Sequence, residues 1–157
     1  MNRRELDHAE QQRRAEHHER TREMVLSSRR TAYIALNRQS RQYLTALRNR
    51  VHALELTPDS TQAAHELEEH RASYRDCYAE AQMIVPDAVL AVARQANQEL
   101  NQSYGVLKRL QNGVPREGDS TASARDRIDH TRELLHELRH TMRCDLGVTE
   151  PSQSLPS

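Results

Sequence analysis

The chain has 157 residues, of which 36% are hydrophobic and 29% charged, and its formal net charge is zero. Aromatic residues make up 3% and consist of Tyr alone, without Phe or Trp. The side chains available for a core are therefore few, and this composition excludes an ordinary globular domain unless long helices organise the chain. No apolar run approaches the roughly 18 residues that would indicate a membrane-spanning helix.

The length suits a single domain, and the ends and cysteines indicate its compartment. The first residues, MNRRELDHAEQQRR, lack the apolar middle of a signal peptide. Cys77 and Cys144 stand far apart without the spacing of a disulfide framework, which suits a reducing environment. We therefore expect a cytoplasmic protein without membrane association.

Residues 3–56 contain neither Pro nor Gly, so one helix can run through them without interruption. Residues 1–23 are almost entirely polar and predict a charged helical extension. From residue 24 onward an apolar stripe recurs in steps of three, four and seven, and predicts a helix over about 24–56 that packs on a neighbour. The stripe comprises Val25, Leu26, Tyr33, Leu36, Tyr43, Leu47, Val51 and Leu54.

Thr57 and Pro58 form the clearest punctuation in the chain. Thr57 has the properties of a helix cap and Pro58 suits a first helical position, so we expect a second helix over about 58–84 after a very short connection. A short connection favours antiparallel neighbours. Pro86 then interrupts the pattern, which resumes over about 86–112. Pro86 either kinks one long helix or separates two.

The segment from Asn112 to Asp119 contains two Gly and one Pro and predicts a loop. A last helix is expected over about 120–146, ending at Gly147, with a disordered tail over 147–157. The inward positions of this helix are Ile128, Leu134, Leu135, Leu138, Met142 and Leu146. The predicted fold class is all-α: an antiparallel bundle of three to four helices over 24–146 with a long, charged N-terminal helix.

Two stretches carry a resemblance. They are TAYIALNRQSRQYLTALRNRVHAL at 31–54 and YRDCYAEAQMIVPDAVLAVARQANQELNQSYGVLKRL at 74–110, in which AEAQMIVPDAVL is the most distinctive block. The chain resembles uncharacterised small helical proteins of high-GC actinobacteria. These proteins have no established activity, so the resemblance implies an origin and a helical fold and no site residues.

Charge is segregated along the chain. No acidic residue lies between Glu23 and Glu55, whereas acidic residues outnumber basic ones within residues 51–100. Four arginines of the first helix share an arc turned away from its Leu/Tyr face, namely Arg30, Arg38, Arg41 and Arg48. They could bind nucleic acid or an acidic protein, or they could be partly neutralised by an adjacent acidic second helix.

Residues 136–140 read HELRH, a match to the H-E-x-x-H zinc signature. Arg143 and Leu146 occupy the places of the Gly and third His of the metzincin motif, which argues against a protease. The spacing of His136, His140 and Cys144 along one helix allows at most an adjacent pair to hold a metal, completed by a residue of another helix. The candidate ligands are His136 and His140.

No catalytic arrangement of Ser, Cys, His or Asp is recognisable, and we expect no enzyme and no cofactor. The leading hypothesis is an interaction or scaffold protein that associates through helix faces, as in a coiled coil, with protein partners that include a second copy of itself. The alternatives are a nucleic-acid-binding accessory protein that uses the Arg stripe and a metal-binding helical protein.

Overall fold

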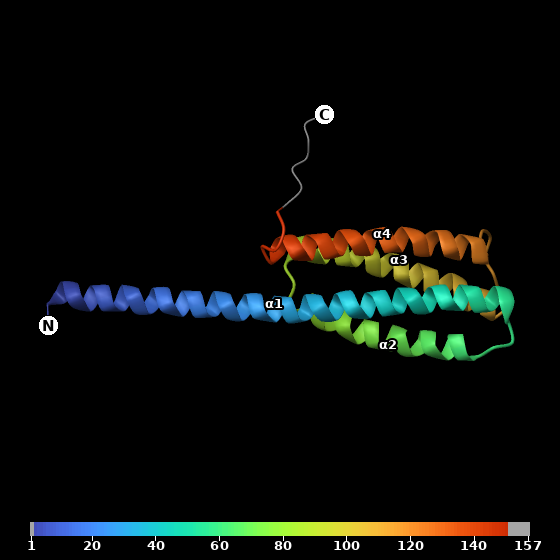
Figure 1. Cartoon of the computed structure of the whole chain (residues 1–157), viewed down its shortest axis with the longest axis horizontal. Helices are drawn as coiled ribbons and strands as arrows, with labels where there is room; N and C mark the ends of the chain where they lie inside the picture. The colour runs from blue at the N-terminus through green and yellow to red at the C-terminus, as the bar shows by residue number, and fades with distance from the viewer. Residues whose placement is uncertain (1, 151–157) are drawn as a thin grey trace, which may run out of the picture.

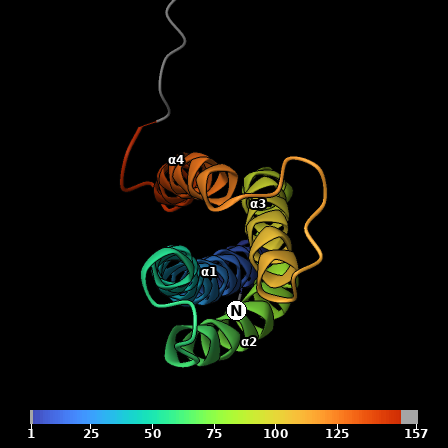
Figure 2. The same ribbon diagram turned by 90° about the vertical axis from the view of Figure 1, so that its right-hand side faces the viewer.

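Four helices make up the part of the chain that the computed structural model describes, residues 2–150. They are α1 (Arg3–Leu56), α2 (Gln62–Gln82), α3 (Asp87–Gln111) and α4 (Thr121–Asp145). Consecutive helices run in opposite directions (Figure 1), and the end-on view shows them surrounding a common centre, with α1 between α2 and α4 (Figure 2). The all-α antiparallel bundle predicted from the sequence is confirmed, with four helices.

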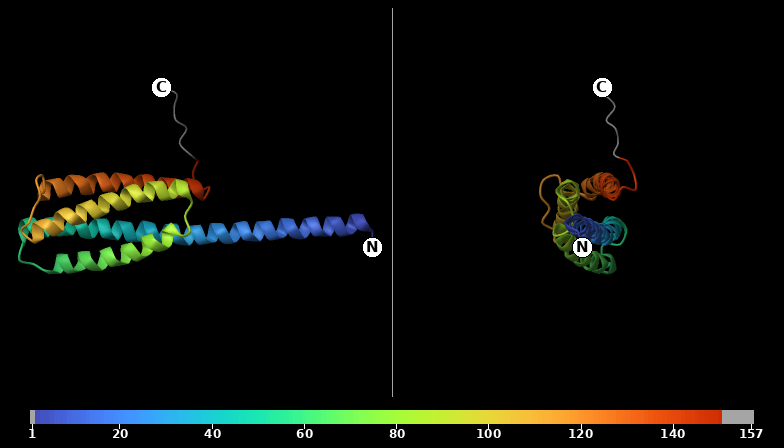
Figure 3. Two further views of the ribbon diagram at one scale, coloured as in Figure 1. Left: turned by 180° about the vertical axis from the view of Figure 1, so that it is seen from behind. Right: turned by 90° about the vertical axis from the view of Figure 1, so that its left-hand side faces the viewer.

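The first half of α1 projects beyond the ends of the other helices (Figures 1 and 3). A capping box starts the helix, in which the Asn2 side chain accepts a hydrogen bond from the backbone of Arg4 and Glu5 accepts one from Asn2. The first buried residue of α1 is Tyr33. Val25, which the apolar stripe placed inward, is 44% exposed, so that prediction was wrong. The reason is tertiary, because α4 ends at Asp145, beside Tyr33.

Tyrosine replaces the missing Phe and Trp in the core. Tyr43 and Tyr74 stack with ring centroids 5.2 Å apart, and Tyr78 continues the stack at 5.9 Å from Tyr74. The Tyr74 hydroxyl donates to Asn97 Oδ1 at 2.9 Å, which joins α2 to α3. Small and aliphatic side chains fill the rest of the core, including Leu36, Leu47, Val51, Leu67, Val89, Ala93, Leu100, Leu107, Ala124, Ile128, Leu138 and Met142.

The second helix begins later than predicted, at Gln62 instead of about residue 58. Thr57 does not cap α2, because its backbone N–H donates to Ala53 O at 2.8 Å and completes the last turn of α1. Ser60 N then donates to Thr57 O at 2.9 Å and closes a turn around Pro58. Thr57 was therefore identified correctly as a helix boundary, but it caps the end of α1 and not the start of α2.

Pro86 separates two helices. α2 ends at Gln82, and Val85 N donates to Ala81 O at 2.9 Å to close its last turn. Pro86 is extended (φ −69°, ψ 160°) and accepts the first helical hydrogen bond of α3 from Leu90 N. The chain reverses here because proline supplies no N–H for a continuing helix. Ile84 lies in this turn and is 43% exposed.

The loop between α3 and α4 is held by one carboxylate. Asp119 accepts hydrogen bonds from Arg109 Nε at 2.6 Å and Nη2 at 3.1 Å, and from Arg116 N at 2.9 Å. The Arg109 guanidinium and the Arg116 amide lower the pKa of Asp119 to about 2. Ser120 follows and caps α4 through a reciprocal pair of hydrogen bonds with Ser123. The predicted loop is confirmed.

Replacing Asp119 with Asn should destabilise the protein at neutral pH and make less difference in acid. The folded-state pKa of Asp119 lies below its ordinary value of 3.8, so its contribution is present above about pH 4 and is lost as the pH falls toward 2. Urea unfolding of both proteins at pH 7, 4 and 2.5 measures this convergence. Asp59→Asn, in the exposed turn after α1, is the matched control, and a gap between parent and Asp119→Asn that does not narrow with falling pH would contradict the assignment.

α4 ends where the sequence predicted. Gly147 adopts φ +73°, which favours glycine, and the amides of Gly147 and Val148 bond back to Cys144 O and Arg143 O at 3.0 Å each. Of the predicted disordered tail, residues 151–157 lie outside the described residues. Between residues 2 and 150, no helix is both long enough and apolar enough to cross a membrane.

Candidate functional site: a cationic groove between α1 and α4

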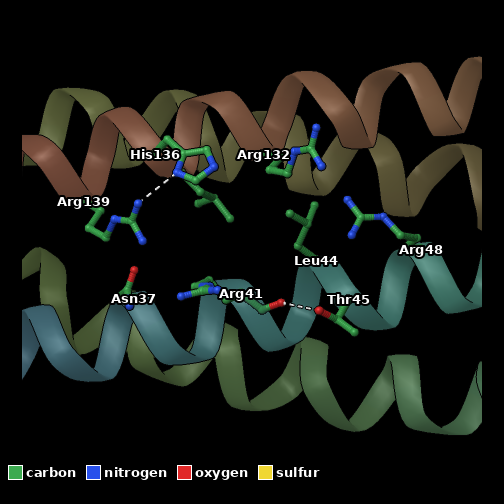
Figure 4. Close-up of a pocket in the computed structure, with 9 residues that line it drawn as sticks. Asn37, Arg41, Leu44, Thr45, Arg48, Arg132, His136 and Arg139 are labelled. Atoms are coloured by element: carbon green, nitrogen blue, oxygen red, sulfur yellow. Dashed lines mark hydrogen bonds between the residues drawn. The ribbon is translucent and has the colours of Figure 1, made fainter.

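A groove runs between α1 and α4 on the surface of the bundle and encloses a cavity of about 140 Å³ (Figure 4). We call it the cationic groove and define it by the nine residues that line it. α1 contributes Asn37, Arg41, Leu44, Thr45 and Arg48, and α4 contributes Arg132, Leu135, His136 and Arg139. Leu44 and Leu135 are buried and form its apolar base.

Helical spacing explains why these side chains meet. The α1 residues at 37, 41, 44, 45 and 48 follow steps of three and four, as do those of α4 at 132, 135, 136 and 139. Each set therefore occupies one face, with its leucine toward the core and its polar groups toward the rim. The antiparallel packing of α1 and α4 then brings the two polar rims together.

The groove carries four guanidinium groups, and no carboxylate is among its nine lining residues. Arg41, Arg48 and Arg132 form no ion pair within residues 2–150. Some arginines outside the groove are paired with carboxylates, such as Arg109 with Asp119 at 2.6 Å and Arg125 with Glu55 at 2.7 Å. The groove thus gathers four positive charges where α1 and α4 meet, although the whole chain is neutral.

His136 belongs to the groove and not to a histidine pair. Arg139 Nη2 donates to His136 Nδ1 at 3.1 Å, and Figure 4 shows both side chains turned into the groove. Because guanidinium has no acceptor, Nδ1 must be the unprotonated nitrogen in this contact. The polar groups that line the groove are thus the arginine N–H groups, the Nε2–H of His136, the Asn37 amide and the Thr45 hydroxyl, and the hydroxyl itself donates to Arg41 O at 3.0 Å.

All four arginines predicted as a binding stripe are exposed, and the structure brings two of them to the groove. Arg41 and Arg48 line it, whereas Arg30 and Arg38 do not. No ion pair within residues 2–150 joins these four arginines to α2, although Arg41 and Glu66 of α2 line one shallow hollow between the two helices. The sequence did not point to Arg132 and Arg139, although their spacing of seven places them on one face.

The candidate metal ligands have separate surroundings. His136 contacts Arg139, and His140 Nε2 lies 3.5 Å from Cys144 Sγ. In the described part of the chain, no three His, Cys, Asp or Glu residues come close enough to hold a metal ion. Of the potential ligands on α4, His140 and Cys144 are therefore the pair whose contact the structure shows.

A second polar cluster joins α2 to α3 through Glu68. Burial disfavours its charge, but hydrogen bonds from Tyr104 and Lys108 outweigh that effect and lower the pKa of Glu68. The Arg71 guanidinium lies over the Tyr104 ring at 4.1 Å from its centroid. The polar and charged groups of this cluster pair with one another, so we interpret the cluster as a structural link between α2 and α3.

The chain matches no family model, no curated protein and no solved structure.

Proposed function

We propose that the protein is a non-enzymatic interaction protein that holds the phosphate backbone of a nucleic acid in the cationic groove. The observation that carries the proposal is the meeting of Arg41 and Arg48 with Arg132 and Arg139 around one cavity lined by no carboxylate. Four unneutralised guanidinium groups in one groove repel one another, and an anion relieves that repulsion.

Arginine chemistry favours phosphate as the bound group. The guanidinium fork donates two parallel hydrogen bonds to a phosphate, and charge assistance makes these bonds stronger than neutral ones. Asn37 and Thr45 add neutral polar groups at the same rim. The groove contains no Phe, Trp or Tyr on which a base could stack, and its one imidazole ring, that of His136, is hydrogen-bonded to Arg139, so we expect binding to the backbone without sequence preference.

The projecting half of α1 supports the interaction part of the proposal. Its side chains over residues 3–25 are exposed apart from half-buried Ala9, and it reaches beyond the bundle (Figure 3). A lone helix is marginal in water, because most helical stability in proteins comes from packing. In a scaffold role this segment packs along a helix of a partner protein. That helix supplies the packing contacts that the bundle itself does not provide.

Fluorescence anisotropy with a labelled 20-nucleotide single strand, at several salt concentrations, tests the proposal. The variant Arg41→Gln/Arg48→Gln/Arg132→Gln should weaken binding at least tenfold at low salt. It should also make the slope of log affinity against log salt shallower by about 2, since each phosphate contact contributes about 0.7. Three exposed arginines outside the groove supply the matched control, Arg75→Gln/Arg94→Gln/Arg116→Gln, which removes the same charge.

Two results would overturn the proposal. One is an absence of salt-sensitive binding by the parent protein at low ionic strength, and the other is an equal loss in the control variant. Polyglutamate of similar length serves as a competitor: if it binds more tightly than the nucleic acid, the partner of the groove is an acidic protein and not a phosphate backbone.

A further inference from the structure

The second histidine of HELRH and a nearby cysteine form a pair that the groove does not use. His140 Nε2 and Cys144 Sγ lie 3.5 Å apart, one helical turn from each other on α4. His140 is exposed and Cys144 half-buried, so a ligand can reach both from solvent. This pair is independent of the cationic groove, toward which Arg139 and His136 are turned (Figure 4).

The separation of the two atoms matches the geometry of a tetrahedral zinc ion. Zinc binds imidazole nitrogen at about 2.0–2.1 Å and thiolate sulfur at about 2.3 Å, and a tetrahedral angle between these bonds places N and S about 3.5 Å apart. The separation of the two atoms is therefore the one that chelation of a single ion requires. Imidazole and thiolate are also the two ligand types that zinc takes in closed structural sites.

The charge of the surrounding helix face suits a cation. Glu133 and Glu137 are exposed and, at 100° per residue, lie on the same solvent-facing side of α4 as His140 and Cys144. Arg139, the nearest basic residue before His140, is hydrogen-bonded to His136 in the groove. Arg143 is rotated around the helix axis by about 100° from Cys144 and by about 60° from His140, so the two glutamates offset a positive charge on the edge of this face.

Two ligands do not complete a zinc site, and no third His, Cys, Asp or Glu within residues 2–150 joins them. A second copy of the chain, related by a two-fold axis, would contribute the same two residues and complete a set of two Cys and two His. The acidic faces of two α4 helices repel each other in the absence of a cation, so such an association depends on the metal.

We propose that His140 and Cys144 are one half of an intersubunit zinc site, at which two copies of the protein meet across their α4 helices around a single Zn²⁺. Each Cys144 thiol loses its proton as its sulfur binds, so formation of the site releases two protons and involves no change of oxidation state. Both end-on views show α4 on the outer side of the bundle, away from α2 (Figures 2 and 3).

The test uses the full, metal-free chain under reducing conditions. Light scattering after gel filtration should show the mass rise from 18.2 kDa to twice that value on addition of Zn²⁺, and calorimetry should give one Zn²⁺ per two chains. Co²⁺ as a spectroscopic probe should give a thiolate-to-cobalt absorption band and the visible bands of tetrahedral cobalt.

Cys144→Ser and His140→Ala should each abolish both the cobalt bands and the zinc-dependent dimer. Cys77→Ser and His130→Ala, which change the other cysteine and another exposed α4 histidine, should leave both unchanged. The proposal is overturned by one Zn²⁺ per monomer, by the absence of a thiolate band with Co²⁺, or by a dimer that persists in Cys144→Ser. None of these readouts involves nucleic acid, so the result is separate from that of the groove.

Discussion

Replacing Leu47 with Ala is expected to lower the free energy of unfolding by about 2–5 kcal/mol, because it removes a fully buried side chain and leaves a cavity. Leu47 belongs to the core on α1, the helix that packs against each of the other three. Buried side chains of a close-packed core have little freedom to fill such a space. Urea denaturation followed by circular dichroism measures the change.

Leu56→Ala provides the matched control for this substitution. Leu56 ends the same helix and is 65% exposed, so the same chemical change should alter the free energy of unfolding by no more than about 0.5 kcal/mol. Leu47→Met, which roughly conserves volume, should cost less than about 1.5 kcal/mol. Equal losses for Leu47→Ala and Leu56→Ala would contradict the placement of the core.

Replacing Arg50 with Met is expected to raise the free energy of unfolding by about 1–3 kcal/mol. Arg50 is 3% exposed, its Nη1 atom is buried without a hydrogen-bond partner, and it forms no ion pair within residues 2–150. Burial lowers the pKa of its guanidinium, which expresses the same desolvation cost. Methionine keeps the aliphatic stem in the core and removes the charge.

Arg38→Met is the control for Arg50→Met, because Arg38 is an exposed arginine of the same helix. It should change stability by less than about 0.5 kcal/mol. A loss of stability in Arg50→Met would show that the guanidinium makes favourable contacts that outweigh its desolvation. Since Arg50 does not line the cationic groove, the variant should bind nucleic acid as the parent does.

The residues of the segment HELRH lie on two neighbouring sides of α4. His136 faces the cationic groove with Arg139, whereas His140 contacts Cys144 one turn further on. The zinc signature in the sequence was therefore an ambiguous pattern, because the spacing of two histidines does not show which groups their nitrogens reach. The groove and the proposed zinc site can be tested separately, since they share no residue.

Local sequence determined the helices of this protein and most of their ends. Gly and Pro are few and, apart from Gly105 inside α3, lie outside the helices, so the positions of Pro58, Pro86, Gly113 and Gly147 were enough to divide the chain. The spacing of apolar residues also identified most of the core, because a helix of 3.6 residues per turn fixes which side chains share a face. The prediction for α2 was four residues early, since a Thr-Pro pair suits the end of one helix as well as the start of the next.

What only the tertiary structure decided is which faces meet. Arg41 and Arg48 on α1, and Arg132 and Arg139 on α4, each look like an ordinary solvated face in the sequence, and they form one groove only because α1 packs against α4. In the same way Arg50 is buried because the bundle encloses its position, and Val25 is exposed because the neighbouring helices stop short of it. Periodicity fixes the direction of a side chain from its own helix, whereas the neighbour it meets depends on contacts between residues far apart in the chain.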